Sequence, residues 1–390
     1  MINLGLSSTD LKLFQQSLYT PPGYNLKVTI QILDLNHNYL ADVSSKFLGG
    51  QVNKSFWDIV TSNATLELLD PDNQVGFDTV NPSEGALYMD RMIKIVYSVW
   101  SDLLPRWVDV PLFCGPVIQV DRDDAILHIE CQGKESLYVP PEMVWTTHSY
   151  PKATKLVTAI RDLLGTRGGE TRFDLPEWTR TLRKDYSLKT ETNTWTQARS
   201  FVGSRLTHQL FYDGRGYLRL RNCPSVPSFT FTEDNLTSVP KIKFESDAIR
   251  NTALVKGATP EGKAQLIGKA YLPASDPSSS TALGRKRSDG TLVKRELVEL
   301  VDDPDLNTQG EVDQEASDTL DSLDLQNVVF DFDSFPIPHL EQGDVFAIAT
   351  RDFGRNLRAK NFSIPLKANE SQTNGTYRRL VPTTRSKRKR

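Results

Sequence analysis

The sequence is poor in cysteine and has no long hydrophobic run. Three cysteines in 390 residues cannot form a disulfide framework, and their odd number fits a reducing compartment. The longest apolar stretch, Met92 to Trp100, is short and contains Lys94, so we expect no membrane span. The first residues, MINLGLSSTDLKLF, lack a basic region followed by an apolar one, so a secretory signal is not expected. A membrane bundle and a disulfide-rich secreted domain are therefore excluded.

The patterns typical of catalytic and metal sites are also missing. No HExxH or other metal-ligand spacing includes the five histidines, which are His37, His128, His148, His208 and His339. There is no GxSxG nucleophile elbow, and Cys223 has no nearby histidine to lower its pKa. Residues 303–314 begin like an EF-hand loop, but Thr308 stands where that loop needs glycine. We therefore predict no catalytic residue, no metal and no cofactor.

The net charge of -3 hides an asymmetry along the chain. Without the seven basic residues of 378–390, the rest of the chain carries a net charge of -10. An acidic body argues against specific nucleic-acid recognition, because phosphate neutralisation dominates that affinity. The candidate partner-docking residues lie in the basic tail and are Arg385, Lys387, Arg388, Lys389 and Arg390. The tail is either a solvated, disordered end or an arm that docks on an acidic partner or on a packaged genome.

Residues 24–145 have the pattern of a run of strands. Apolar residues alternate with polar ones over residues 26–32, 64–69 and 93–99, as in half-buried strands. Asp121 to Asp124 form a polar turn, which predicts a hairpin between residues 117–120 and 125–131. Pairing Val120 with Ala125 would place Cys114 opposite Cys131. Short strands with regular turns and no helix between them favour a sandwich or a barrel.

The pattern becomes mixed after Pro151. Leu156 to Leu164 have helical spacing, and Gly165 is placed to end that helix. A second helix is predicted to start at Thr194, where Thr194 to Gln197 match a capping box. A hairpin with an Asp213-Gly214 turn follows. This region is predicted to be a small α+β unit.

Strand patterns return from about Lys241. Residues 251–257, 265–272, 328–332, 345–350 and 362–366 are predicted strands, and residues 275–290 are a polar loop. Residues 299–324 contain no Lys or Arg, and their apolar positions predict a short helix at 312–323. No internal repeat is evident between the two β regions.

The order of these parts resembles that of one protein family. The resemblance is carried by the following segments, in this order: NATLELLDP (63–71), GPV (115–117) before a hairpin, the helices and the DG hairpin, IRNTALVKG (249–257), the acidic helix, and PIPHLEQGDVF (336–346). They are similar to the tail-hub proteins of long-tailed bacteriophages, which are related to the central baseplate hub of contractile phages. The resemblance covers about residues 24–367.

The resemblance implies a mainly β fold with an α+β insert, in which two tail-tube-like β-barrels flank a small α+β domain. The domains expected from it are an N-terminal arm (1–23), a first β-barrel (24–145), an α+β domain (146–240), a second β-barrel (241–368) with a loop and helix insertion (273–324), and a basic C-terminal tail (369–390).

The resemblance also implies a structural role in the virion, after synthesis in the host cytoplasm. A homotrimer would present six barrels in a ring at the tail tip and adapt a six-fold tube to three-fold tip proteins. Its expected partners are the distal tail protein ring, the tape-measure protein and tip, fibre or receptor-binding proteins, and its channel would pass DNA. Two other functions stay open: a tail-associated cell-wall or polysaccharide hydrolase that uses a carboxylate pair, and a carbohydrate-binding adhesin.

Overall fold

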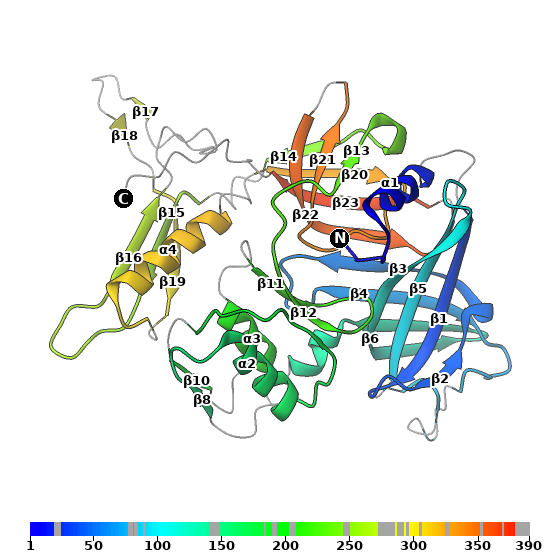
Figure 1. Ribbon diagram of the computed structural model, residues 1–390, viewed down its shortest axis with the longest axis horizontal. Helices are drawn as coiled ribbons and strands as arrows, with labels where there is room; N and C mark the ends of the chain where they lie inside the picture. The colour runs from blue at the N-terminus through cyan, green and yellow to red at the C-terminus, as the bar shows by residue number, and fades with distance from the viewer. Residues whose placement is uncertain are drawn as a thin grey trace.

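The computed structural model describes most of the chain. The described residues are 1–18, 25–76, 81, 85–88, 91–139, 148–182, 185–188, 193–202, 208–244, 250–271, 285–286, 292–293, 296–303, 306–323, 328–351, 354–368 and 370–378. They form a mainly β structure with several sheets (Figure 1). Among these residues, no helix is long and apolar enough to cross a membrane.

The first β region forms a sheet that turns over on itself at one long strand, β6. Its strands are β1 (Leu26–Asp34), β2 (Tyr39–Asp42), β3 (Phe47–Ser55), β4 (Ser62–Leu69), β5 (Arg91–Ser101), β6 (Arg106–Asp123) and β7 (Ile126–Gln132). The first part of β6 pairs with β5 and its last part with β7, so two layers share this strand. Short 3-10 turns lie at Ser44–Lys46 and Lys134–Tyr138, and helix α1 (Ser8–Ser17) contacts β5.

The alternating patterns predicted for these strands are confirmed. In β4, Ala64, Leu66 and Leu68 are buried, whereas Glu67 and Leu69 are exposed. The strand ends at Leu69, directly before the Asp-Pro pair that cannot continue the ladder. The core of this region also contains the predicted apolar residues of β1 and β5, among them Ile30, Ile32, Ile93, Ile95, Tyr97 and Val99.

The hairpin between β6 and β7 exists, but its predicted register is wrong. Asp123 pairs with Ile126, so the turn contains only two residues, and Asp124 adopts a left-handed φ of 52°. This tight turn slides one strand along the other. Cys131 therefore lies opposite Val117, while Cys114 pairs with Lys94 of β5, and both cysteines are free.

The second β region does not form a separate sheet. Its strands are β13 (Phe229–Phe231), β14 (Lys241–Phe244), β20 (Val328–Ser334), β21 (Val345–Ala349), β22 (Gly354–Pro365) and β23 (Gln372–Arg378), with a 3-10 turn at Glu233–Asn235. Strand β22 pairs with β3, which joins both regions in one sheet and one hydrophobic core. None of the sheets formed by the described residues closes into a barrel, so two separate barrels are not confirmed.

The middle region combines helices and short strands around its own core. It contains β8 (His148–Tyr150), α2 (Leu156–Ile160), a π-helical turn (Arg161–Arg167), β9 (Phe173–Asp174), β10 (Tyr186–Leu188), α3 (Thr194–Val202), β11 (His208–Tyr212) and β12 (Leu218–Asn222). Gly165 does not end the first helix, because the π turn carries it to Arg167. The cap of α3 is also one residue earlier than predicted: the Asn193 side chain accepts a hydrogen bond from the Thr196 amide.

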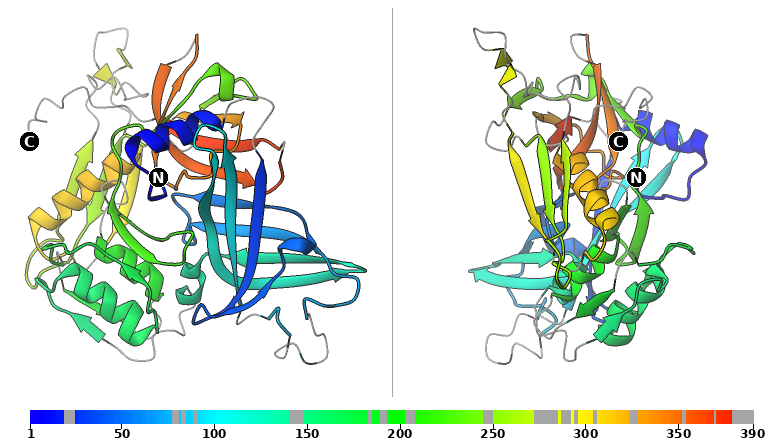
Figure 2. Two further views of the ribbon diagram at one scale, coloured as in Figure 1. Left: turned by 45° about the vertical axis from the view of Figure 1, so that its right-hand side comes forward. Right: turned by 90° about the vertical axis from the view of Figure 1, so that its left-hand side faces the viewer.

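A smaller layer is inserted between β14 and β20. Its sheet contains β16 (Ile267–Tyr271), β15 (Thr252–Lys256) and β19 (Val298–Asp302), and helix α4 (Gln309–Leu323) covers one face (Figure 2). Val312, Ala316 and Leu320 of α4 are buried, as their helical spacing predicts. Within the polar loop 275–290, only strand β17 (Arg285–Lys286), paired with β18 (Leu292–Val293), belongs to the described residues. The exact domain boundaries stay a prediction.

Candidate functional site

Eight strands form one continuous antiparallel run, in the order β14-β20-β23-β22-β3-β4-β7-β6. We call β3, β4, β6 and β7 the first unit, and β14, β20, β22 and β23 the second unit. Numbered along the chain, the strands of both units lie in the same spatial order: first, second, fourth, third. The chain therefore contains the same four-stranded unit twice, joined edge to edge at β22 and β3 (Figure 1).

A β-bulge at the same position supports this equivalence. In the first unit, the register shifts between Val117 and Gln119, so Ile118 is the extra residue of β6. In the second unit, the register shifts between Ala359 and Asn361, so Lys360 is the extra residue of β22. Both bulges lie in the third strand of the unit and face its fourth strand. The repeat that the sequence does not reveal is therefore present in the backbone.

One face of the eight-stranded run is polar, and most of its charged side chains are acidic. Directly paired residues point to the same side of a sheet, so the ladders assign each position to a face. One such row crosses the junction of the units and contains Gln132, Asn63, Asn53, Ser363, Thr373 and Asp333. The carboxylates on this face are Glu67, Asp121, Asp123, Glu130, Asp331 and Asp333, and Lys241 is a cation there.

The polar face is hollowed where the two units meet. A depression of about 540 Å³ lies over β3, β22 and β23 and extends to Lys241 of β14. Its walls are mainly amide and hydroxyl side chains, and its charged residues are Asp58, Asp331 and Asp333 with the opposing Lys54 and Lys241. Hydrogen bonds order these side chains: Ser363 Oγ donates to Gln51 Oε1 at 3.0 Å across the junction. The hollow has few apolar walls, so it does not resemble a pocket for an apolar ligand.

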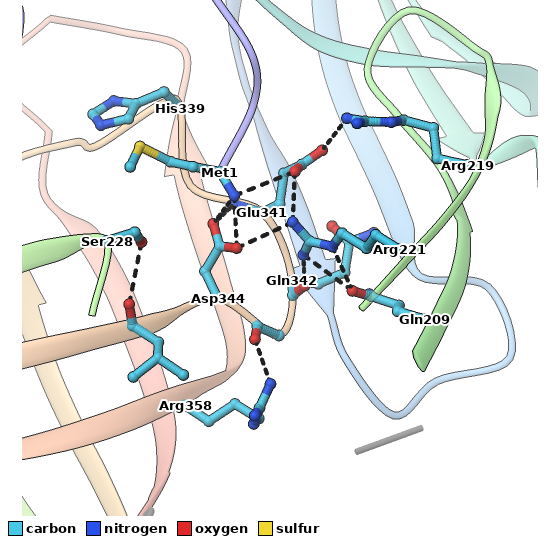
Figure 3. A network of polar contacts seen from close by, with 12 residues as sticks. Met1, Gln209, Arg219, Arg221, Ser228, His339, Glu341, Gln342, Asp344 and Arg358 are labelled. Carbon is cyan, nitrogen blue, oxygen red and sulfur yellow. Dashed lines mark hydrogen bonds and ion pairs between the residues drawn. The ribbon is translucent and has the colours of Figure 1, made fainter. Parts of the chain in front are cut away.

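A buried ion-pair network lies beside the junction, where the N-terminus, β12 and the loop before β21 meet (Figure 3). Arg221 Nη1 lies 2.9 Å from Glu341 Oε2 and 3.2 Å from Asp344 Oδ1. The Met1 amine lies 2.6 Å from Asp344 and 3.4 Å from Glu341. Gly343, with a left-handed φ of 78°, makes the turn between the two acids, a conformation that glycine adopts without steric cost.

The charges in this network control each other's protonation. Burial raises the pKa of Glu341. Arg221 and the Met1 amine lower this pKa by more than burial raises it, so it falls to about 2. Burial lowers the pKa of Lys54, which lies on β3 at the junction, against the opposing effect of Glu341 and Asp344. His339 is fully buried, and burial followed by the nearby amine lowers its pKa to about 3, so its imidazole is neutral. Paired charges therefore join the N-terminus and the middle region to the loop before β21.

The DG hairpin fixes the middle region against the first unit. Gly214, at its tip, packs so closely on the backbone of Pro111 in β6 that a Cβ atom would overlap the Pro111 carbonyl oxygen. Nearby, Trp195 Nε1 of α3 donates a hydrogen bond of 2.8 Å to the Ile59 carbonyl oxygen. Both contacts join the middle region to strands or loops of the first unit.

The histidines and cysteines do not assemble a catalytic site among the described residues. His37 Nδ1 lies 3.9 Å from Cys114 Sγ, but burial raises the pKa of this thiol to about 11, so it stays protonated. Burial and Lys134 lower the pKa of His37 to about 4. His128 lies on the polar face, with Nδ1 3.7 Å from a carboxylate oxygen of Glu67. No cluster of metal-ligating side chains occurs in the described part of the chain.

The two sites that the structure reveals differ in how far the sequence points to them. The docking residues proposed in the basic tail, Arg385 to Arg390, lie outside the described residues. The polar face follows from strand alternation, but its continuity depends on the pairing of β22 with β3, which no local pattern predicts. The ion-pair network includes residues of the PIPHLEQGDVF segment, whose signal is four polar residues among apolar ones: His339, Glu341, Gln342 and Asp344.

Comparison with known proteins gives likeness in structure only. No family description and no curated protein sequence matches the chain. A tail protein from Neisseria meningitidis MC58 superimposes with a TM-score of 0.60 and 9% identity, over 91% of this chain and 97% of that one. The 43 kDa tail protein of prophage MuSo2 from Shewanella oneidensis superimposes with a TM-score of 0.58 and 9% identity, over 90% of this chain and 98% of that one. For prophage tail protein gp18 from Listeria monocytogenes EGD-e, the TM-score is 0.52 and the identity 9%, over 90% of this chain and 94% of that one. The chain therefore has the fold of these tail proteins.

Proposed function

We propose that the chain is a structural hub protein of a phage-type tail, which forms a homotrimeric ring at the tail tip. The observation that carries this proposal is the duplicated four-stranded unit, joined edge to edge in one sheet. A single chain thereby supplies two equivalent segments of a ring. In this proposal, each unit with the strands that fold over it corresponds to one tail-tube-like β-barrel, in the domain order expected from the sequence.

Symmetry explains why a duplicated unit is useful. Three copies related by a three-fold axis would present six similar units around that axis. Such a ring can match a six-fold tube on one side and three-fold tip proteins on the other. We propose the distal tail protein ring, the tape-measure protein and tip, fibre or receptor-binding proteins as its neighbours.

The polar face is suited to line the channel of that ring. Its carboxylates, such as Glu67, Glu130 and Asp121, repel phosphate groups, so DNA would pass without binding. Amide and hydroxyl side chains around the hollow keep the surface hydrated and offer no large apolar area on which a passing protein would stick. This role needs no catalysis and no cofactor, and no specific nucleic-acid recognition.

The oligomeric state of the purified protein tests the proposal. We expect light scattering at increasing concentration to reveal a trimer, and negative-stain averages to show a three-fold ring with a central opening. Monomers at every concentration, or particles of another symmetry, would contradict the ring. Reproducible release of sugar or peptide fragments from host cell wall would favour the hydrolase, and binding of monomers to host glycans would favour the adhesin.

A further inference from the structure

The eight-stranded run ends in two strand edges that lack a partner among the described strands. One edge is β14, and the other is the last part of β6, residues 117–123, which pairs only with β7. Every neighbouring pair in the run is antiparallel, so the two end strands point in opposite directions. Placed side by side, β6 of one copy and β14 of another would continue the same antiparallel pattern. Open edges of this kind favour pairing with another chain.

The duplication predicts that the open edge of β6 in one copy pairs with the open edge of β14 in another. The internal junction joins the third strand of the second unit, β22, to the first strand of the first unit, β3. The equivalent contact between two copies joins the third strand of the first unit, β6, to the first strand of the second unit, β14. The internal junction is therefore a template for the register between copies.

The bulges fix the equivalence of β6 and β22. Since Ile118 corresponds to Lys360, Gln119 corresponds to Asn361, and Asp123 corresponds to Pro365. The remaining ladders fix the equivalence of β3 and β14. They run through Cys131, Ala64 and Val52 in the first unit, and through Thr376, Phe330 and Ile242 in the second. Val52 therefore corresponds to Ile242, and Gln51 corresponds to Lys241.

The transferred register places opposite charges face to face. In the internal junction, Pro365 pairs with Gln51, and Ser363 pairs with Asn53. The equivalent positions between copies are Asp123 opposite Lys241 and Asp121 opposite Lys243. The neutral pairs of the internal junction thus become acid–base pairs between copies. The register follows from the backbone ladders alone, so the match of opposite charges supports it independently.

We propose that residues 117–123 of β6 pair with β14 of a second copy of this chain, with Asp123 opposite Lys241 and Asp121 opposite Lys243. The proposal rests on the ring described above and states which edges close it. Asp123 and Lys241 are exposed in the single chain. Within its own chain Lys241 pairs with Asp331, and Asp121 accepts a hydrogen bond of 2.6 Å from Gln119 and lies opposite His128. These contacts leave the outer edges of both strands open.

The internal β22–β3 junction also predicts that Asp123 and Lys241 of the next copy lie close together. Leu366 donates a backbone hydrogen bond to Gly50, and Phe56 donates one to Lys360, so Pro365 and Gln51 lie between hydrogen-bonded positions. Residues at such non-hydrogen-bonded positions have the shortest separation across an antiparallel pair. Asp123 and Lys241 of the next copy would therefore be within reach of a disulfide after substitution by cysteine.

Disulfide trapping tests the register directly. In a Cys223→Ser background, Asp123→Cys with Lys241→Cys is expected to give cross-linked dimers and trimers on a non-reducing gel after mild oxidation. Asp121→Cys with Lys241→Cys is the matched control, because diagonal neighbours lie about 7 Å apart and cannot be bridged. A three-fold ring in negative-stain averages in which the first pair stays unlinked, or links no better than the control, would overturn this junction and leave the ring intact. A protein that is monomeric at all concentrations would contradict both.

A charge exchange gives a second measure without oxidation. Lys241→Glu places like charges at each junction and is expected to weaken trimer formation by about tenfold or more, because every junction of a ring carries the change. Adding Asp123→Lys should restore association. The same exchange does not restore the pairing of residue 241 with Asp331 inside the chain. Thermal unfolding of diluted monomer therefore measures the loss of this internal pairing separately from the loss of association between copies. Failure of the second substitution to rescue association would contradict the proposed pairing.

Discussion

Arg221 of β12 and Glu341 of the loop before β21 form a buried ion pair of 2.9 Å between the middle region and the second β region. The same guanidinium also donates to the Gln342 carbonyl oxygen at 2.8 Å and to Gln209 Oε1 at 3.0 Å. One side chain thus satisfies several buried acceptors at once. The junction of the two units is built beside this point, so we expect its geometry to depend on Arg221.

Arg221→Met should lower the free energy of unfolding by about 3–5 kcal/mol, because it removes the nearest cation of buried Glu341 and a second cation beside buried Asp344. Arg219→Met is the matched control on the same strand. Arg219 lies 3.8 Å from Glu341, and its other partner, Asp174, is largely exposed, so this change should cost about 1 kcal/mol or less. Urea denaturation of both variants measures the difference. Equal losses would show that the network contributes no more than a surface ion pair.

His339 should make the protein less stable as the pH falls below about 6.5. Its pKa is lowered from 6.5 to about 3, so the unfolded chain binds a proton that the folded chain refuses throughout this window. The contribution of neutral His339 to the free energy of unfolding is fully present above pH 6.5. It falls by about 1.4 kcal/mol per pH unit as the pH falls toward 3. Glu341 adds to the loss between its ordinary pKa of 4.5 and about 2.

His339→Phe removes the titrating ring from a site lined by Phe14 and Phe229. Denaturation at several pH values should then show a smaller loss of stability between pH 6.5 and 3. Phe229→Leu disturbs the same packing without changing a titratable group, so it should lower stability equally at each pH. An unchanged pH dependence in His339→Phe would refute the assignment.

The sequence predicts well those features that depend on neighbouring residues. The alternation of Ala64, Leu66 and Leu68 and the helical spacing of Val312 and Ala316 both report which side of an element meets the core, and the structure agrees. The predicted register of the β6–β7 hairpin is wrong, because a two-residue turn with left-handed Asp124 and a bulge at Ile118 shift the strands relative to each other.

The internal duplication is hidden for a different physical reason. Equivalent positions such as Ala64 and Phe330, or Cys131 and Thr376, carry unlike side chains. Each unit packs against different neighbours, so its residues are selected by different surroundings while the backbone pairing stays the same. Long-range pairing between β3 and β22 likewise has no local signal. The continuous polar face could therefore be anticipated strand by strand but not as one surface.

Two glycines should respond to alanine in opposite directions. Gly214→Ala introduces a Cβ atom that overlaps the Pro111 carbonyl oxygen, so the hairpin must move and stability should fall by about 1–3 kcal/mol. Gly310 lies in α4 with open space around it, so Gly310→Ala should raise stability by about 0.5–1 kcal/mol through the lower entropy of the unfolded chain. Thermal unfolding measures both. A harmless Gly214→Ala would mean that the hairpin does not press on β6.

Reversing the charge of the polar face should convert it into a surface that binds DNA. Glu67 and Glu130 lie on adjacent strands of this face, so Glu67→Lys with Glu130→Lys replaces repulsion of phosphate groups by attraction. We expect affinity for a labelled duplex, measured by fluorescence polarisation, to rise by about tenfold or more at low salt and to fall steeply as salt is added. Glu177→Lys with Glu261→Lys makes the same change of net charge at exposed positions away from the sheet. If both variants bind equally, only net charge matters, and the polar face has no special part in keeping DNA from adhering.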